Sequence, residues 1–182
     1  MTRALSGLLA GFSLPTKDRR LLEAVILPYF ANREDFTRIL FVGCAWYTRR
    51  YRRLFPHKQY STLDADPAKS GWGAEHHICD SLVRIASHFN DGTLDAILCN
   101  GVFGWGLNKK PEVEAAFQGC YQCLRRGGVF MLGWNDIPKR RPFPLESCES
   151  LNLFQPYRFE PLDSNCHRTE TRNKHVYSFY RR

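Results

Sequence analysis

The chain has 182 residues and a formal net charge of +8, and 43% of its residues are hydrophobic and 14% aromatic. This composition is typical of one globular domain with a sizeable core, and it excludes a disordered or fibrous chain. No apolar run approaches the length of a membrane-spanning helix. The N-terminal stretch MTRALSGLLAGFSL lacks an A-x-A cleavage site, so we do not expect its removal as a signal peptide.

The seven cysteines are an odd number, and three of them fall in or at the ends of predicted strands: Cys44, Cys79 and Cys99. Free cysteine at such positions behaves as a small buried hydrophobic residue. The pattern predicts a reduced, cytoplasmic protein.

Residues 17–29 carry apolar side chains at helical spacing behind Thr16 and predict a helix that packs on a sheet. The run RILFVGCAWY, residues 38–47, then shows four apolar residues without polar alternation and ends at Gly43. Such a run is typical of a parallel strand covered on both faces, although a short buried helix shares the pattern. Gly43 can adopt a positive φ and allows the backbone to approach a ligand, which favours a strand that enters a turn.

A helix is expected over residues 47–55, with Thr48 as a possible N-cap and Pro56 as the stop. A second strand, Tyr60 to Leu63, ends on Asp64, which follows Gly43 by 21 residues. In dinucleotide folds an acid about 20 residues after the glycine turn accepts hydrogen bonds from ribose hydroxyls. Residues 38–64 are therefore predicted to form, in order, a strand, a glycine turn, a helix and a second strand that ends on an acidic residue.

The middle of the chain continues this alternation, with a loop over residues 67–75, a third strand that leads to Asp80, a short helix over 82–89 and a fourth strand over 94–99. The following stretch, NGVFGWG over residues 100–106, combines three glycines with two aromatic rings. Open α/β sheets bind ligands in the loops that follow the carboxyl ends of their strands. This loop is therefore a second candidate ligand site.

A helix is predicted over residues 112–124, where Cys120 and Cys123 form a C-x-x-C pair. Zinc needs four ligands, and the other Cys and His residues lie far away in the chain, so the pair favours a buried helix face over a metal site. A fifth strand follows over 129–134. Residues 138–161 are irregular, with at most a short helix near 145–153, and two strand candidates at 158–162 and 175–180 would form an antiparallel pair.

Five segments together resemble the class I S-adenosylmethionine-dependent methyltransferases: ILFVGCAWY, YSTLDADP, HHICDSL, LDAILCNGVF and LRRGGVFML. The resemblance covers residues 38–136. It implies a Rossmann-like α/β fold with a mostly parallel seven-stranded sheet, helices on both faces and a C-terminal antiparallel strand pair. The chain would form one domain, 1–182, with an N-terminal helical segment (1–37), a cofactor-binding core (38–136) and a substrate-side segment with the strand pair (137–182).

The resemblance also implies a site for S-adenosylmethionine. The residues expected to bind the cofactor are Gly43, Cys44, Ala45, Asp64, Ala65, Asp80, Ser81 and Asn100. Asn100 and Phe103 partly match the Asn-Pro-Pro-aromatic motif of methyltransferases that act on amino groups, which implies that Asn100 orients a substrate nitrogen and Phe103 stacks on it. The alternative interpretation is that Asn100 is a turn residue.

Two alternatives to an active methyltransferase remain open. The turn departs from the family at Phe41, Ala45 and Tyr47, and the Tyr47 ring could fill the space that the methionine end needs, which would leave a degenerate binding or regulatory module. The other alternative is a nucleic-acid binder, because basic residues cluster at 49–53, 139–141 and 181–182. We interpret these clusters as solvated faces and expect a small-molecule or amine acceptor in preference to nucleic acid, with no metal and no membrane partner.

Overall fold

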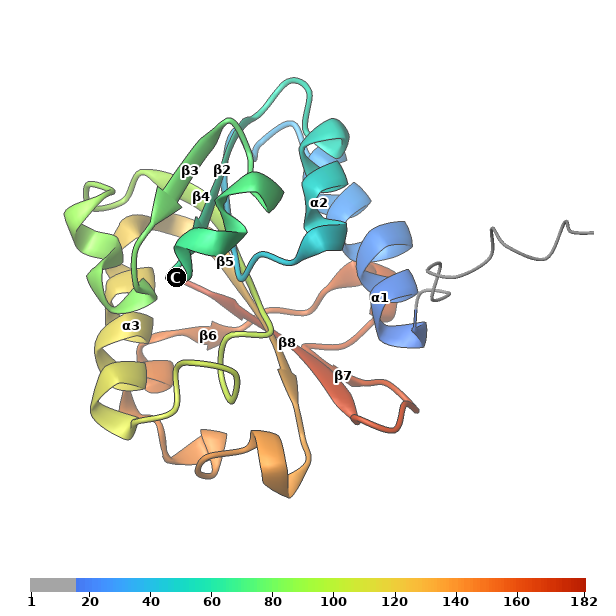
Figure 1. Cartoon of the computed structure of the whole chain (residues 1–182), viewed down its shortest axis with the longest axis vertical. Coiled ribbons are helices and arrows are strands. Elements are labelled where there is room, and N and C mark those ends of the chain that lie inside the picture. Colours follow the sequence, from blue (N-terminus) through green and yellow to red (C-terminus); the bar gives the residue numbers. More distant parts are fainter. Residues whose placement is uncertain (1–15) are drawn as a thin grey trace, which may run out of the picture.

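The computed structural model describes residues 16–182, in which eight strands form one mixed sheet with helices on both faces (Figure 1). The strand order is β3-β2-β1-β4-β5-β8-β6, and β7 also pairs with β8. The N-terminal stretch, for which we expect no removal, lies outside the described residues. Within the described part, no helix is long and apolar enough to cross a membrane.

Five neighbouring strands run parallel and form the half of the sheet that the sequence predicts. They are β1 (Arg38–Val42), β2 (Gln59–Asp64), β3 (His76–Cys79), β4 (Leu94–Asn100) and β5 (Leu124–Asn135). Residues 39–42 of β1 are at most 1% exposed, because β1 lies between β2 and β4 and both of its faces are covered. The carboxyl ends of these strands therefore meet along one edge of the sheet.

The antiparallel part is built on β8 (His175–Arg181), which pairs with β5, β6 (Gln155–Pro156) and β7 (Cys166–Arg168). The prediction of a strand at 158–162 is wrong, because this segment contains the 3-10 turn η8 (Glu160–Leu162). Pro161 has no N–H to donate to a ladder, and the next residue but one, Asp163, has a φ of 49°. The fold is the Rossmann-like methyltransferase arrangement that the resemblance implies.

The N-terminal helical segment, residues 17–32, covers one face of the sheet. It consists of α1 (Lys17–Leu21), the π-helical turn η1 (Leu22–Ile26) and α2 (Leu27–Asn32). Its apolar stripe packs in one cluster with the side chains of Ile39 and Phe41 from β1. The predicted helix is confirmed, and burial of this stripe holds it to the sheet.

The opposite face is covered by α3 (Lys110–Cys123). Its buried face includes Val113, Phe117 and Cys120, which pack with Leu40 and Val42 of β1. Cys123 is also fully buried on this helix. Among the described residues, no group of three or more potential ligands could hold a metal ion.

Short 3-10 segments form most of the connections: η2 (Trp46–Leu54), η3 (Pro67–Trp72), η4 (Leu82–Ser87), η5 (Pro138–Arg140), η6 (Leu145–Ser147) and η7 (Glu149–Leu153). Thr48 is not the N-cap of η2 but its third residue, and its Oγ1 accepts a hydrogen bond from the Ala45 N–H at 3.1 Å. The predicted loop at 67–75 contains η3, whose first turn Asp66 caps by accepting from the Ala68 N–H at 3.0 Å. Side-chain caps from Asp66 and Ser81 therefore mark the starts of η3 and η4, whereas η2, η5, η6 and η7 begin without one.

Candidate functional site

A cavity of about 310 Å³ opens at the carboxyl ends of β1, β2 and β4. The strand order reverses between β1 and β4, because the chain first builds outward to β3 and then returns to the other side of β1. In open α/β sheets the crevice at such a reversal is where ligands bind. The fold thus places the cavity where the glycine turn and the NGVFGWG loop meet.

Asp64, the last residue of β2, lines the cavity and is 8% exposed. Its carboxylate accepts hydrogen bonds from the N–H groups of Cys44 at 2.7 Å and Asp66 at 2.9 Å. The Lys69 ammonium, which also lines the cavity, lies 3.3 Å from Oδ2 of this carboxylate. Lys69 Nζ also lies 3.4 Å from Oδ1, so these three donors make four hydrogen bonds. A carboxylate has about four acceptor positions, and a further donor would therefore have to displace Lys69.

Gly43 is required by chain packing. Its φ is +95°, and a Cβ at this position would lie 2.2 Å from the carbonyl oxygen of Asn100. Its N–H donates to the carbonyl of Leu63 at 3.0 Å, which ties the turn to β2. Gly43 itself lines the cavity, whereas Cys44 and Ala45 are not among the lining residues.

The loop after β4 covers another side of the cavity. Gly101 and Gly106 line it, and a Cβ on either would meet no atom within 4 Å. Trp105 also lines it, is 50% exposed, and donates from Nε1 to Asn135 Oδ1 at 2.9 Å. The guanidinium of Arg140 lies 3.3 Å from the centre of the Trp105 indole. An aromatic ring is therefore held at the cavity by β5 and η5, while the glycines leave the space beside it open.

Asn100 does not line the cavity and is instead part of a buried polar chain. Asn135 donates from Nδ2 to His175 Nδ1 at 3.2 Å, so His175 carries its proton on Nε2 and donates it to Asn100 Oδ1 at 3.0 Å. Burial lowers the pKa of His175 to about 4, so the imidazole is neutral near pH 7. The chain fixes the orientation of the Asn100 amide beside the glycine turn.

Phe103 is fully buried and makes edge-to-face contacts with Trp134 and Phe143, with ring centres 6.0 and 5.3 Å away. A ring in this position cannot stack on a ligand in the cavity. The expected stacking role of Phe103 therefore needs correction, because the apolar core beneath the loop has taken up its side chain.

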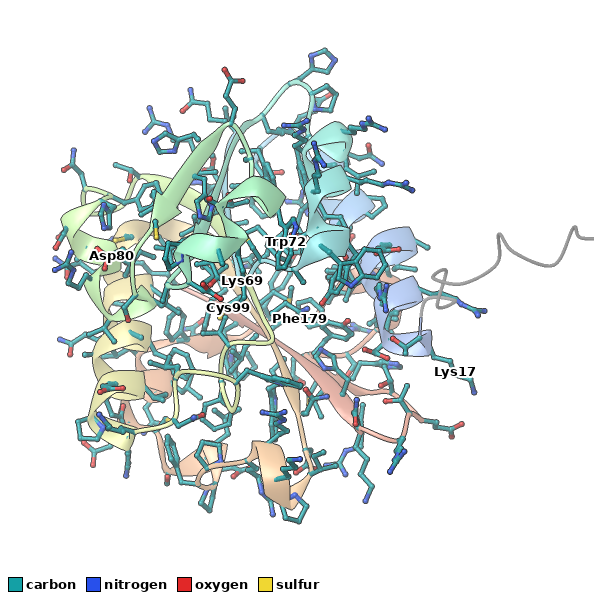
Figure 2. The ribbon with its side chains drawn as sticks, viewed as in Figure 1. Lys17, Lys69, Trp72, Asp80, Cys99 and Phe179 are labelled. Carbon is teal, nitrogen blue, oxygen red and sulfur yellow. The ribbon has the colours of Figure 1, made fainter. Side chains whose placement is uncertain are left out.

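Asp80 lies at the end of β3, but its carboxylate is bound by Arg84 at 2.7 Å and by His88 at 2.7 Å. These hydrogen bonds hold its pKa well below the usual range. In Figure 2 Asp80 lies toward the side of η4, apart from Lys69. Asp80 is not among the cavity-lining residues, whereas its neighbour Ser81 is, as is Ala65 beside Asp64. A contact of Asp80 with adenine stays a prediction.

Three residues of the site carry no signal in the sequence. Lys69 lies in a stretch expected to be a loop, Glu112 at the start of α3 lines the cavity, and His175 reaches the site only because β8 pairs with the end of β5. Only the register that places His175 opposite Asn135 could have identified it.

Comparison with known proteins assigns the family. A family model described as a methyltransferase domain matches residues 40–132, which are 93 of the 182 residues. The chain therefore belongs to the methyltransferase domain family, in the class I S-adenosylmethionine-dependent group, and S-adenosylmethionine is the cofactor that this membership indicates. No curated protein matches the chain in sequence.

Solved structures are similar in fold at low sequence identity. The N-methyltransferase NodS from Bradyrhizobium japonicum WM9 has a TM-score of 0.66 at 12% identity, with 92% of this chain and 98% of that chain covered. A SAM-dependent methyltransferase from Archaeoglobus fulgidus has a TM-score of 0.60 at 13% identity, covering 88% and 91%. The 1,6-didemethyltoxoflavin-N1-methyltransferase of Burkholderia thailandensis, with bound 1,6-didemethyltoxoflavin and S-adenosylhomocysteine, has a TM-score of 0.55 at 14% identity, covering 87% and 77%. These structural similarities support the assignment of the fold.

Proposed function

We propose that this protein transfers a methyl group from S-adenosylmethionine to a small-molecule acceptor, most simply an amine. The observation that carries the proposal is the cavity at the β1–β4 reversal, which joins the Asp64 carboxylate to open, glycine-lined space. Two of the structurally similar enzymes are named N-methyltransferases, which favours a nitrogen acceptor.

The lining residues suit the cofactor by their chemistry. A ribose hydroxyl would bind Asp64 in the acceptor position that Lys69 holds at 3.3 Å, and Leu63, Leu82 and Leu107 provide apolar surface for adenine. The cofactor supplies a methyl group on a sulfonium, so the chain has mainly to hold two reactants in line and exclude water. Asn100 is not among the cavity-lining residues and His175 engages its Oδ1, so a contact of Asn100 with the acceptor nitrogen stays a prediction.

The proposal is tested by calorimetric titration with S-adenosylhomocysteine, which measures cofactor affinity without turnover. Asp64→Ala removes the ribose acceptor and should weaken binding by about 1–3 kcal/mol, or about 5- to 150-fold in Kd. Asp80→Ala tests the predicted contact with adenine, and because Arg84 and His88 hold this carboxylate outside the cavity we expect a smaller loss than for Asp64→Ala. Far-UV circular dichroism must show both variants folded at the temperature of the titration, since Asp64 also holds the Cys44 N–H.

Absence of binding by the wild-type protein would contradict the proposal. Equal losses in both variants would instead support the predicted contact of Asp80 with adenine. Once binding is established, an amine acceptor screen in which S-adenosylhomocysteine is the measured product tests the transfer itself.

The second candidate is a degenerate fold that binds a partner but transfers nothing. The sequence suggested that the Tyr47 ring fills the cofactor space, but Tyr47 does not line the cavity. The observation that favours this candidate is instead the Lys69 ammonium, which binds the Asp64 carboxylate. If Lys69 blocks the ribose position, Lys69→Met should tighten the binding of S-adenosylhomocysteine. The ion pair is partly exposed and contributes only about 0–1 kcal/mol, so the variant should remain folded.

A further inference from the structure

The segment η2 (Trp46–Leu54), the turquoise helix beside α2 in Figure 1, exposes four arginines in nine residues. A 3-10 helix has three residues per turn, so side chains three apart lie on one line along it. One line carries Trp46, Arg49 and Arg52, and a second carries Tyr47, Arg50 and Arg53. The third line turns inward, with Thr48 and Tyr51 buried. The 3-10 geometry thus converts the sequence WYTRRYRR into two ridges, each an aromatic residue followed by two arginines.

None of these four arginines has a carboxylate partner among residues 16–182. The preceding residues, 1–15, contain no Asp or Glu in their sequence. Other cations behave differently, since Arg84, Arg141 and Arg168 all bind carboxylates. Charges that repel one another on a single short helix are best stabilised by an anionic partner.

The arginines line a hollow of about 720 Å³ between η2 and the N-terminal helical segment. Five of its ten lining residues are arginines, and the single acid, Glu23, already accepts a hydrogen bond from the Tyr51 hydroxyl at 2.9 Å. Trp46 at its rim is 55% exposed. The guanidinium of Arg19 lies 4.4 Å from the centre of the Tyr47 ring and 5.6 Å from that of Trp46. The surface therefore joins a large exposed aromatic face to a row of free guanidinium groups.

We propose that this surface binds a single-stranded nucleic acid, with phosphates on the two arginine ridges and a base on Trp46. The combination of a positive groove with an aromatic platform is the one that single strands require, because their bases are free to stack. A duplex has no unstacked base for Trp46, and a peptide of acidic residues alone has no ring to stack on it. The inference concerns binding alone and does not depend on methyl transfer.

The test measures fluorescence anisotropy of a labelled RNA of about 12 nucleotides, titrated with the full chain without cofactor from about 50 to about 200 mM salt. Changing Arg49, Arg50, Arg52 and Arg53 together to Gln removes four phosphate contacts. It should weaken binding and reduce the slope of log K against log salt by about 2.8, since each contact on a single strand contributes about 0.7. Trp46→Ala should weaken binding by about tenfold and leave the slope unchanged, because the indole carries no charge.

The matched control changes four other exposed cations to Gln: Arg126, Lys139, Arg172 and Lys174. It alters the net charge equally, and we expect affinity close to that of the wild-type protein. If the quadruple η2 variant fails to fold, Arg49→Gln with Arg52→Gln removes one ridge and should reduce the slope by about 1.4.

Three results would overturn the proposal. Equal losses of affinity in the η2 and control variants would show that net charge alone accounts for the binding. An unchanged affinity after Trp46→Ala would show that no base stacks on the indole of Trp46. Competition by duplex DNA, polyglutamate or anionic vesicles as effective as that by unlabelled RNA would show that the surface binds anions of any kind.

Discussion

Replacement of Gly43 by alanine should destabilise the protein far more than the same change at Gly101, although both glycines line the cavity and both have a positive φ. At Gly43 the new Cβ would lie 2.2 Å from the carbonyl oxygen of Asn100 and 2.9 Å from Cγ2 of Val102. At Gly101, where φ is +67°, it would meet nothing within 4 Å. Comparison of the two substitutions therefore separates the cost of a positive φ from the cost of steric overlap.

The positive φ costs about 1–3 kcal/mol for a residue that carries a Cβ. The overlap at Gly43 is with backbone, and Asn100 cannot move easily because it ends a strand that pairs on both sides. Overpacking of this kind adds about 1–3 kcal/mol. Gly43→Ala should thus cost about 2–6 kcal/mol and Gly101→Ala about 1–3 kcal/mol, against a total of about 5–15 kcal/mol for a typical domain.

Urea denaturation followed by circular dichroism measures both variants, with the slope of the transition checked against that of the wild-type protein. Equal losses of stability would refute the steric argument and would mean that the turn relaxes around the new methyl group. Calorimetry on Gly101→Ala adds an independent result, because a Cβ in the open space should weaken cofactor binding in a variant that is still well folded.

Three further predictions follow from buried groups. The pKa of His175 is about 4 in the folded protein, so between about pH 6.5 and 4 only the unfolded chain protonates this imidazole. The free energy of unfolding should therefore fall by up to about 3 kcal/mol as the pH drops from 6.5 to 4. In His175→Gln this part of the pH dependence should disappear from urea titrations. A thiol reagent should react quickly with the exposed Cys79 and Cys166, and with the five buried cysteines only after unfolding. Burial also raises the pKa of a thiol, to about 12 for Cys99, which slows its reaction further. A third fast-reacting thiol in the native protein would argue against this packing. Thr48→Val should cost about 1 kcal/mol in thermal unfolding, because the Thr48 hydroxyl bonds to Ala45 and to the Trp72 carbonyl, whereas Thr93→Val, at an exposed hydroxyl, should cost less.

The sequence predicts the parallel half of the fold well, because its strands are buried on both faces and appear as apolar runs that stop at glycine or acid. The strands ending at Val42 and Asp64 are both confirmed within one residue. Short segments are harder to predict. Residues 67–73 contain two glycines and a proline, which are typical of a loop, yet residues 67–72 form a 3-10 turn that the Asp66 side chain caps.

The candidate site divides in the same way. Gly43, Asp64, Ala65 and Ser81 line the cavity, since they end or follow strands whose carboxyl ends share one edge, and their binding of the cofactor stays a prediction. Phe103 looks like an exposed loop aromatic in the sequence, but the core between Trp134 and Phe143 takes up its ring. Asp80 is engaged by Arg84 and His88, which local spacing could have suggested only if η4 had been known to begin at Leu82.

The five parallel strands, the glycine turn and the position of Asp64 can be predicted from the amino-acid sequence alone, because each depends on neighbours within a few residues. The tertiary structure alone decided which groups share the cavity and which are used elsewhere. Lys69 on Asp64, His175 on Asn100 and the arginine ridges beside Trp46 depend on pairing register, on burial or on helix type. His175 meets Asn100 through pairing of strands distant in the chain, whereas Lys69 and the arginine ridges are placed by the 3-10 geometry of η3 and η2, which the residue pattern did not predict.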